Sequence, residues 1–179
     1  EKSSPRLKKG IAMTIDATPG GAEADSYVTL TQADEYFQDD YDFSSNWSNL
    51  SEQDRSRLLI TATRMLDRLN YKGRRYDYFT PQALKFPRVI GDEVISLDQA
   101  GQLTIPVFVR RAVCEQARQV YQSGSAGGAE DLAFMGVESF RLDKIALNLS
   151  GGQTTHGLCP AASRLLAPFL VHSVELRRA

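Results

Sequence analysis

The chain has 179 residues, a length that fits one domain or one domain with additional arms. Its formal net charge of −1 at pH 7 excludes the overall basic field of a protein that binds nucleic acid through its whole surface. The hydrophobic share of 42% is enough for a modest core, and no apolar run of about 18 residues indicates a membrane span.

Residues 1–25 are expected to form an N-terminal arm. The stretch 1–12 is rich in lysine and arginine, and residues 18–24 (TPGGAEA) have turn composition. A capping box of Thr29 and Gln32 then predicts a helix over residues 30–39. The polar segment 40–50 carries three aromatic residues, and we expect either a loop pinned by rings or one short helical turn.

The most strongly periodic stretch begins after Ser51, a residue suited to cap a helix. Apolar residues recur there at spacings of three and four, which predicts one buried stripe: Leu58, Leu59, Ala62, Met65, Leu66 and Leu69. Gly73 is expected to end this helix, because glycine adopts the left-handed C-terminal conformation without strain. From Arg88 to Ile105 the chain is expected to be irregular.

Three further elements are predicted after residue 105. Pro106 suits the first position of a helix that runs to about Gln122, before a break at residues 123–128. Alternation of apolar and polar residues predicts a β-hairpin near 137–149. Pro160 opens a short last helix over residues 161–167.

Together these patterns predict a mainly α fold, a small helical bundle with three main helices and a short C-terminal helix. A β-hairpin and extended terminal arms complete it. The helical domain is expected to cover residues 26–167, and residues 168–179 to form an extended C-terminal tail. The residues that we expect in the core are Tyr36, Phe37, Leu59, Ala62, Leu66, Leu69, Val109 and Val113.

The sequence lacks the arrangements typical of enzymes, so we expect no catalysis, no cofactor and no metal. HExxH, GxSxG and Walker A patterns are absent. His156 and Cys159 have an H-x-x-C spacing, but a zinc site needs three or four ligands, so a plain loop is preferred. Cys114 and Cys159 are expected to be free thiols rather than a disulfide. A small enzyme with an unrecognised site stays an alternative.

One group of basic residues lies near the end of the second main helix. Tyrosines and a phenylalanine at positions 71, 76, 78 and 79 are interleaved with it, which is typical of a surface that binds single strands. We prefer a structural interpretation, in which the cations favour the helix dipole or pair with Asp67 and the rings are buried. The group is Arg64, Arg68, Lys72, Arg74 and Arg75.

Several motifs in a shared order resemble the head–tail connector proteins of tailed bacteriophages, also called adaptor or head-completion proteins. The same group is also labelled DnaT-like single-stranded-DNA-binding proteins. The resemblance depends on SYVTL (26–30), ATR (62–64), LDRL (66–69), GRR (73–75), QAL (82–84), FPR (86–88) and residues 105–121 and 159–170. The chain departs from the pattern at Met65 and at Lys85-Phe86, where tryptophan is expected. The motif positions with expected structural roles are Tyr27, Tyr36, Phe37, Asp67, Gly73 and Pro87.

The connector resemblance implies a structural virion protein that forms a ring of about twelve copies below the portal. Its partners would be further copies of itself, the portal protein, tail or tail-terminator proteins, and genomic double-stranded DNA that passes without sequence-specific contact. The protein would lie in the virion neck after assembly in the host cytoplasm, away from membranes. A near-neutral charge suits such a conduit. The alternative function is a single-stranded nucleic-acid-binding protein that uses the basic residues at 64–79.

The C-terminal tail is expected to dock on a neighbouring subunit or on the portal. Apolar residues follow the helix-stopping Pro168, and a solitary domain would leave them frayed. The expected docking residues are Phe169, Leu170, Val171, Val174, Arg177 and Arg178.

Overall fold

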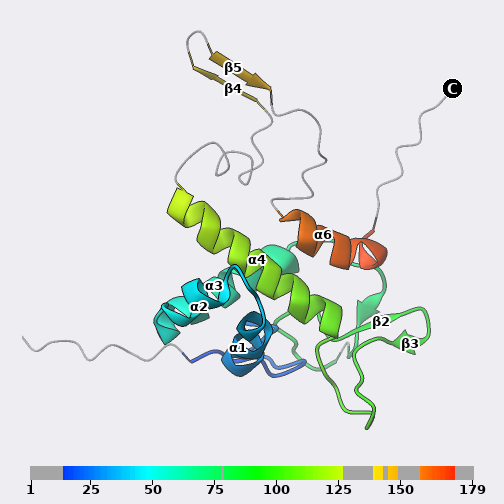
Figure 1. Cartoon of the computed structure of the whole chain (residues 1–179). Coiled ribbons are helices and arrows are strands. Elements are labelled where there is room, and N and C mark those ends of the chain that lie inside the picture. Colours follow the sequence, from blue (N-terminus) through cyan, green and yellow to red (C-terminus); the bar gives the residue numbers. More distant parts are fainter. Residues whose placement is uncertain (1–13, 78, 127–138, 143–144, 149–157, 172–179) are drawn as a thin grey trace, which may run out of the picture.

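The structure is a computed structural model that describes residues 14–77, 79–126, 139–142, 145–148 and 158–171 (Figure 1). It confirms the mainly α fold. The elements in chain order are α1 (Leu30–Gln38), α2 (Ser44–Ser48), α3 (Glu52–Asp67), β1 (Arg74–Arg75), β2 (Arg88–Ile90), β3 (Glu93–Val94), α4 (Val107–Ala126), β4 (Ser139–Leu142), β5 (Ile145–Asn148), α6 (Pro160–Leu166) and the 3-10 helix η1 (Ala167–Phe169).

Helix α4 is the centre of the helical body. Figure 1 shows it crossing the molecule with α6 on one side and α1 on the other, and α3 also packs against it. The buried core joins these helices through aromatic and branched side chains, among them Phe37, Trp47, Leu59 and Val113. The aromatic part is tight, since the ring centroids of Phe37 and Trp47 are 4.6 Å apart. Burial of this kind supplies the main stabilisation of such a domain.

The predicted starts of α1 and α3 are confirmed, and the predicted stripe is buried at Leu59, Ala62, Leu66 and Leu69 but only partly buried at Leu58 and Met65. Thr29 and Gln32 form a reciprocal capping box at α1, and the side chain of Ser51 accepts a hydrogen bond from the amide of Asp54 at α3. Seven of the eight expected core residues are buried, whereas Tyr36 is only partly buried. The segment 40–50 contains the short helix α2, the second of the two expected alternatives.

Gly73 has the left-handed backbone that was predicted, but the prediction that it ends the helix was wrong. Helix α3 ends at Asp67, with Arg68 as its cap, six residues before the glycine. Gly73 has φ +75°, and a Cβ atom there would lie 2.0 Å from the carbonyl oxygen of Val89. The position therefore requires glycine because strand β2 passes directly over it.

Two other expectations were also wrong. The stretch 88–105 is not irregular throughout, since β2 pairs with both β1 and β3 in a three-stranded antiparallel sheet of order β1-β2-β3. Helix α4 does not break at residue 123 but continues to Ala126. Ser123 is buried, and Gln119 Nε2 donates to its hydroxyl oxygen at 3.2 Å, which supports this last turn.

The hairpin prediction is confirmed. Strands β4 and β5 pair antiparallel, with Leu142 opposite Ile145 and Ser139 opposite Asn148. Figure 1 shows the two strands apart from the helices, at the end of α4 away from the β1-β2-β3 sheet.

The start of the expected tail lies on the body of its own chain. Leu170 is buried and forms an isolated bridge with Tyr71, while the amide of Val171 donates to the carbonyl of Asn70 at 2.8 Å. The ring of Phe169 stacks on that of Phe108 with centroids 3.9 Å apart. Residues 168–171 are thus part of the domain, which the expected boundary at residue 167 had left out.

Candidate nucleic-acid interface

A buried polar network joins the C-terminal end of α3 to the segments before and after it. The hydroxyl of Tyr27 donates to Asp67 Oδ1. The amide of Lys85 donates to the same oxygen at 2.7 Å and lies 3.1 Å from the tyrosine oxygen, which also accepts from the amide of Phe86 at 3.3 Å. Burial, followed by the charge of Asp67, raises the pKa of Tyr27 well above its usual value, so this phenol stays a donor.

The network answers the question that the sequence left open about Asp67. The hydroxyl and amide donors occupy its carboxylate, and among the described residues no ion pair joins it to an arginine. Of the two structural alternatives that the sequence left open, the ion pair of Asp67 with an arginine is therefore not found among the described residues.

Arg88 is a buried cation that organises the loop after α3. It is 7% exposed, and its guanidinium donates to four backbone carbonyls, those of Tyr71 at 3.2 Å, Lys72 at 3.0 Å, Gly73 at 2.7 Å and Lys85 at 3.3 Å. Burial lowers its pKa, although neighbouring phenols and Asp67 oppose the shift. The guanidinium has five donors in a planar fork and can bind four carbonyls, more than the three donors of a lysine ammonium allow.

The five basic residues singled out in the sequence are all exposed. Arg64 and Arg68 lie four residues apart at the end of α3 and so share a face, while Arg74 and Arg75 form β1. Lys72 Nζ donates to the carbonyl of Pro168 at 2.8 Å, so this lysine also holds the C-terminal segment. In the described part of the chain, no ion pair includes any of the five.

The aromatic residues around these cations divide into two kinds. Tyr71 is buried, as the structural interpretation expected, and packs edge-on against Phe86 with centroids 4.9 Å apart. Tyr76 and Phe79 are exposed instead, Phe79 at 93%. Asp77 shapes the turn that presents Phe79 by accepting hydrogen bonds from the amide of Phe79 and the hydroxyl of Thr80. Tyr78 lies outside the described residues.

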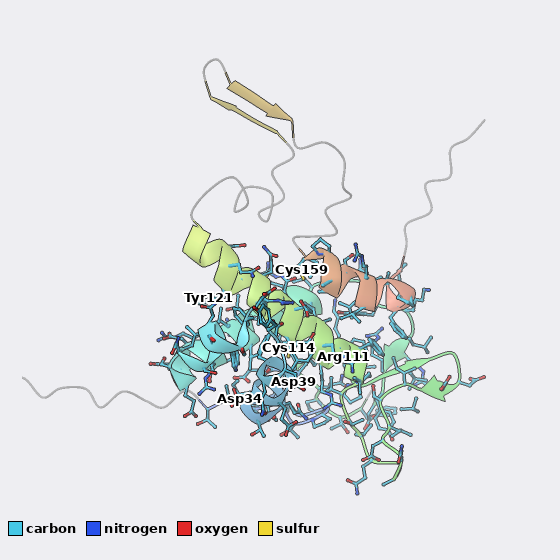
Figure 2. The ribbon with its side chains drawn as sticks, viewed as in Figure 1. Asp34, Asp39, Arg111, Cys114, Tyr121 and Cys159 are labelled. Atoms are coloured by element: carbon cyan, nitrogen blue, oxygen red, sulfur yellow. The ribbon has the colours of Figure 1, made fainter. Side chains whose placement is uncertain are left out.

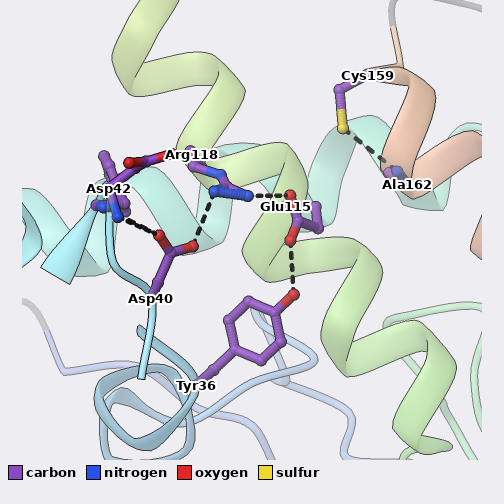
Figure 3. A network of polar contacts seen from close by, with 8 residues as sticks. Tyr36, Asp40, Asp42, Glu115, Arg118, Cys159 and Ala162 are labelled. Atoms are coloured by element: carbon purple, nitrogen blue, oxygen red, sulfur yellow. Dashed lines mark hydrogen bonds and ion pairs between the residues drawn. The ribbon is translucent and has the colours of Figure 1, made fainter. Parts of the chain in front are cut away.

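The remaining motif residues have structural positions. Pro87 is buried and follows a cis peptide bond, and its carbonyl accepts from the amide of Tyr76 at 3.1 Å. Tyr36 links α1 to α4, since its hydroxyl donates to Glu115 at 2.6 Å. Arg118 then pairs with both Glu115 and Asp40, at 2.9 and 2.8 Å, and closes the bridge (Figure 3).

Both cysteines are free and buried, as expected. Burial raises the pKa of Cys114 to about 12 and also raises the pKa of Cys159. The sulfur of Cys159 caps α6 by accepting a hydrogen bond from the amide of Ala162 at 3.3 Å (Figure 3). His156 lies outside the described residues, so the H-x-x-C spacing is not tested.

Among the expected docking residues, the structure describes three. Leu170 is buried and Phe169 partly buried within the chain, and only Val171 is exposed, at 56%. Val174, Arg177 and Arg178 lie outside the described residues. A docking role for these residues stays a prediction.

Sequence reasoning missed two buried polar residues. Arg88 was noted only as part of a motif, and its burial has no sequence signal beyond the neighbouring proline. Gln116 is fully buried in α4, where its side-chain oxygen accepts from the amide of Cys159 at 2.9 Å and so fixes the start of α6. A polar residue on an apolar helix stripe was the available signal.

The described residues contain no group of three or more His, Cys, Asp or Glu side chains that could hold a metal ion. None of the described helices has both the length and the apolar character needed to cross a bilayer.

Comparison with protein families gives a match over residues 11–179 to the family described as "Putative DnaT-like ssDNA binding protein". The chain belongs to this family. No curated protein and no solved structure matches the chain. The match agrees with the second label attached to the resemblance, while the bacteriophage connector role stays a prediction.

Proposed function

We propose that the chain binds single-stranded nucleic acid through the surface formed by Arg64, Arg68, Lys72, Arg74 and Arg75, hereafter the basic surface. The observation that carries the proposal is that five exposed cations lie in one short segment that contains a single carboxylate, Asp67. This carboxylate already accepts hydrogen bonds from the hydroxyl of Tyr27 and the amide of Lys85. Phosphate groups of a nucleic acid would supply the missing counter-charge. Membership of a family described as DnaT-like and ssDNA-binding supports the same function.

The exposed aromatic rings favour single strands over a duplex. Tyr76 and Phe79 lie next in the chain after the basic surface and have exposed side chains. Bases stack on aromatic rings only when they are unpaired, and each such contact contributes about 1–3 kcal/mol. We therefore expect an oligonucleotide strand to bind more tightly than its duplex.

A salt titration with matched charge reversals tests this proposal. Arg68→Glu and Arg74→Glu each reverse one charge of the basic surface, and Arg164→Glu makes the same change at an exposed position on α6. We expect the plot of log affinity against log salt to become shallower by about 0.7 for each single-strand phosphate contact that is lost. Only the first two variants should show this change. Equal binding by all three variants, or no binding of single strands at low salt, would exclude the basic surface.

A second candidate is the head–tail connector. Its support is the resemblance together with segments that lie outside the helical body, above all the β4–β5 hairpin between α4 and α6 (Figure 1). Isolated two-stranded hairpins are at best marginally stable, so a partner surface would stabilise this one. In this role the protein has no catalytic function. It forms a ring of about twelve copies in the virion neck, in contact with the portal and tail proteins, and the basic surface faces the DNA channel.

Electron microscopy of a virion neck, or of portal-bearing heads mixed with the purified chain, tests the connector role. We expect density for the chain in a ring below the portal. Binding to single strands without any attachment to such heads would leave only the first function.

A further inference from the structure

A groove of about 440 Å³ lies between α1 and α4. Helix α1 and its C-terminal cap line it with Gln32, Glu35, Tyr36 and Asp39, and α4 lines it with Val107, Arg110, Arg111 and Cys114. In each helix these positions follow the spacing i, i+3, i+4 and i+7, so each helix gives one continuous face to the groove. Figure 2 shows Asp39, at the C-terminal end of α1, near Arg111 and Cys114 on α4.

The two walls carry charges of opposite sign that have no partner within the described chain. Glu35, Asp39 and Arg111 are exposed, and no ion pair of the described residues includes them. The Nε atom of Arg110 is buried without a hydrogen-bond partner in the described structure, which is costly for a polar atom. Apolar side chains complete the lining, including Val28 and the half-exposed Val107. A suitable ligand therefore combines both signs of charge with apolar groups.

The C-terminal segment outside the described residues has that composition. Residues 172–179 (HSVELRRA) place Glu175 close to Arg177 and Arg178, with Val174 and Leu176 between and beside them. Residues 1–13 carry four basic residues against one glutamate, and residues 127–138 carry acids without a base. The segment 149–157 has no acidic or basic residue apart from His156.

We infer that the groove binds residues 174–178 of a second copy of this chain. In this contact Arg177 and Arg178 pair with the carboxylates of Glu35 and Asp39. Glu175 pairs with Arg110 and Arg111 of α4. Val174 and Leu176 pack on the apolar part of the groove lining. Complementary charge patterns of this kind fix the register and orientation of a docked peptide.

The position of the C-terminal segment favours a second copy over the same chain. Val171 is held against Asn70, and η1 and α6 lie on the side of α4 opposite α1 (Figure 1). A segment that leaves η1 would have to pass around α4 to enter its own groove, whereas a neighbouring groove can be approached directly. Contact between a tail and a groove is heterologous, so repetition builds a closed ring or an open filament.

This contact is independent of nucleic-acid binding, and it would supply one inter-subunit contact to the connector role. If it fails, both proposed functions stand, because oligonucleotide binding and head attachment are measured separately and neither requires this groove.

Charge exchange between two variants tests the inference. The groove variant combines Glu35→Lys with Asp39→Lys, and the tail variant combines Arg177→Glu with Arg178→Glu. Mass photometry and sedimentation velocity of the full chain report association. We expect each variant alone to associate at least tenfold more weakly than the unmodified chain, and an equimolar mixture to regain association because each altered tail then meets a complementary groove. The matched control Asp92→Lys with Glu93→Lys reverses two exposed charges outside the groove and should change nothing.

A peptide of residues 170–179 gives an independent measurement on the chain that ends at residue 171. Saturable binding, lost in the groove variant, is the expected result. Association of the groove variant that equals that of the unmodified chain would overturn the inference, as would failure of the mixture to regain it. If the chain stays monomeric at all concentrations and the peptide binds only after the tail is removed, the groove binds the tail of its own chain. That result would overturn the contact with a second copy.

Discussion

The carboxylate of Asp67 determines how much positive charge the end of α3 presents to solvent. It lies among four arginines in sequence, yet it accepts hydrogen bonds from Tyr27 and from the amide of Lys85. Because hydrogen bonds and not cations satisfy it, the charges of the basic surface stay available to a ligand. The buried network is thus the structural origin of the proposed nucleic-acid interface.

Replacing Tyr27 by phenylalanine tests this network. The change removes the hydroxyl that donates to Asp67 and that lies within hydrogen-bond distance of the amides of Lys85 and Phe86. These buried polar groups therefore lose a hydrogen-bond partner. We expect the free energy of unfolding to fall by about 1–3 kcal/mol in urea titrations. Tyr41→Phe is the matched control, since Tyr41 is 97% exposed and should stay within about 0.5 kcal/mol. Equal effects of the two changes would contradict the role of Tyr27.

Arg88 gives a second prediction at this scale. Lysine keeps the charge but cannot reach four carbonyls of the loop at the same time. Arg88→Lys should therefore lower the free energy of unfolding by at least about 2 kcal/mol, because buried carbonyls lose their donors. Arg164→Lys, at an exposed site on α6, should be neutral. A neutral Arg88→Lys variant would show that water replaces the guanidinium without cost.

The elements differ in how well the sequence predicts them. The helices were predicted because their apolar stripes and caps are local signals, as at Thr29 and Ser51. Strands of two or three residues, such as β1 and β3, are too short to show alternation, so the sheet was missed. Gly73 has the composition signal of a helix end, but its role depends on Val89, a residue far along the chain.

A matched pair of glycine substitutions tests that close approach. Gly73 and Gly91 both have positive φ, of 75° and 62°, but only Gly73 has a neighbour in the space where a Cβ would lie. Gly91→Ala should cost roughly 1–2 kcal/mol, the strain of a left-handed alanine. Gly73→Ala should cost clearly more, since β2 must also move. Similar losses of stability for the two variants in thermal or urea unfolding would show that β2 can shift at little cost in free energy.

The buried stripe of α3 supplies a packing prediction. Leu66 is fully buried between α3 and its neighbours, so Leu66→Ala should lower the free energy of unfolding by about 2–5 kcal/mol. Leu58 lies on the same helix but is only partly buried, and Leu58→Ala should cost less. Chemical denaturation of both variants gives the comparison, and the reverse order would mean that the helix face is misplaced.

At the scale of the whole molecule, the sequence shows which charged residues are present but not which of them are free to bind a ligand. The five basic residues were identified from their spacing, but their freedom from carboxylate partners depends on contacts between distant segments. The groove between α1 and α4 was not predicted at all, because its two faces come from helices about 75 residues apart in the chain. Sequence patterns locate each face, and only packing brings the faces together.

Buried acids distributed through the core predict how the whole domain responds to alkaline pH. Burial raises the pKa of Cys114 from 9.0 to about 12 and also raises the pKa values of Tyr27, Tyr36 and Tyr71 above 10.0. Above pH 9 the unfolded chain therefore releases protons that the folded chain retains. Stability must fall as the pH rises through this range, since the folded state binds more protons.

Urea titrations between pH 8 and pH 11 measure this dependence. We expect the midpoint to be nearly constant below pH 9 and to decrease steadily above it. Cys114→Ala removes one of the buried acids, so its curve should decline less steeply from pH 9 onward, by up to about 1.4 kcal/mol for each pH unit. Tyr41→Phe alters an exposed phenol and should follow the unmodified chain. If the urea midpoints of Cys114→Ala and of the unmodified chain decline in parallel, the thiol ionises as readily in the folded chain as in the unfolded one. That result would contradict the burial of Cys114 in the structure.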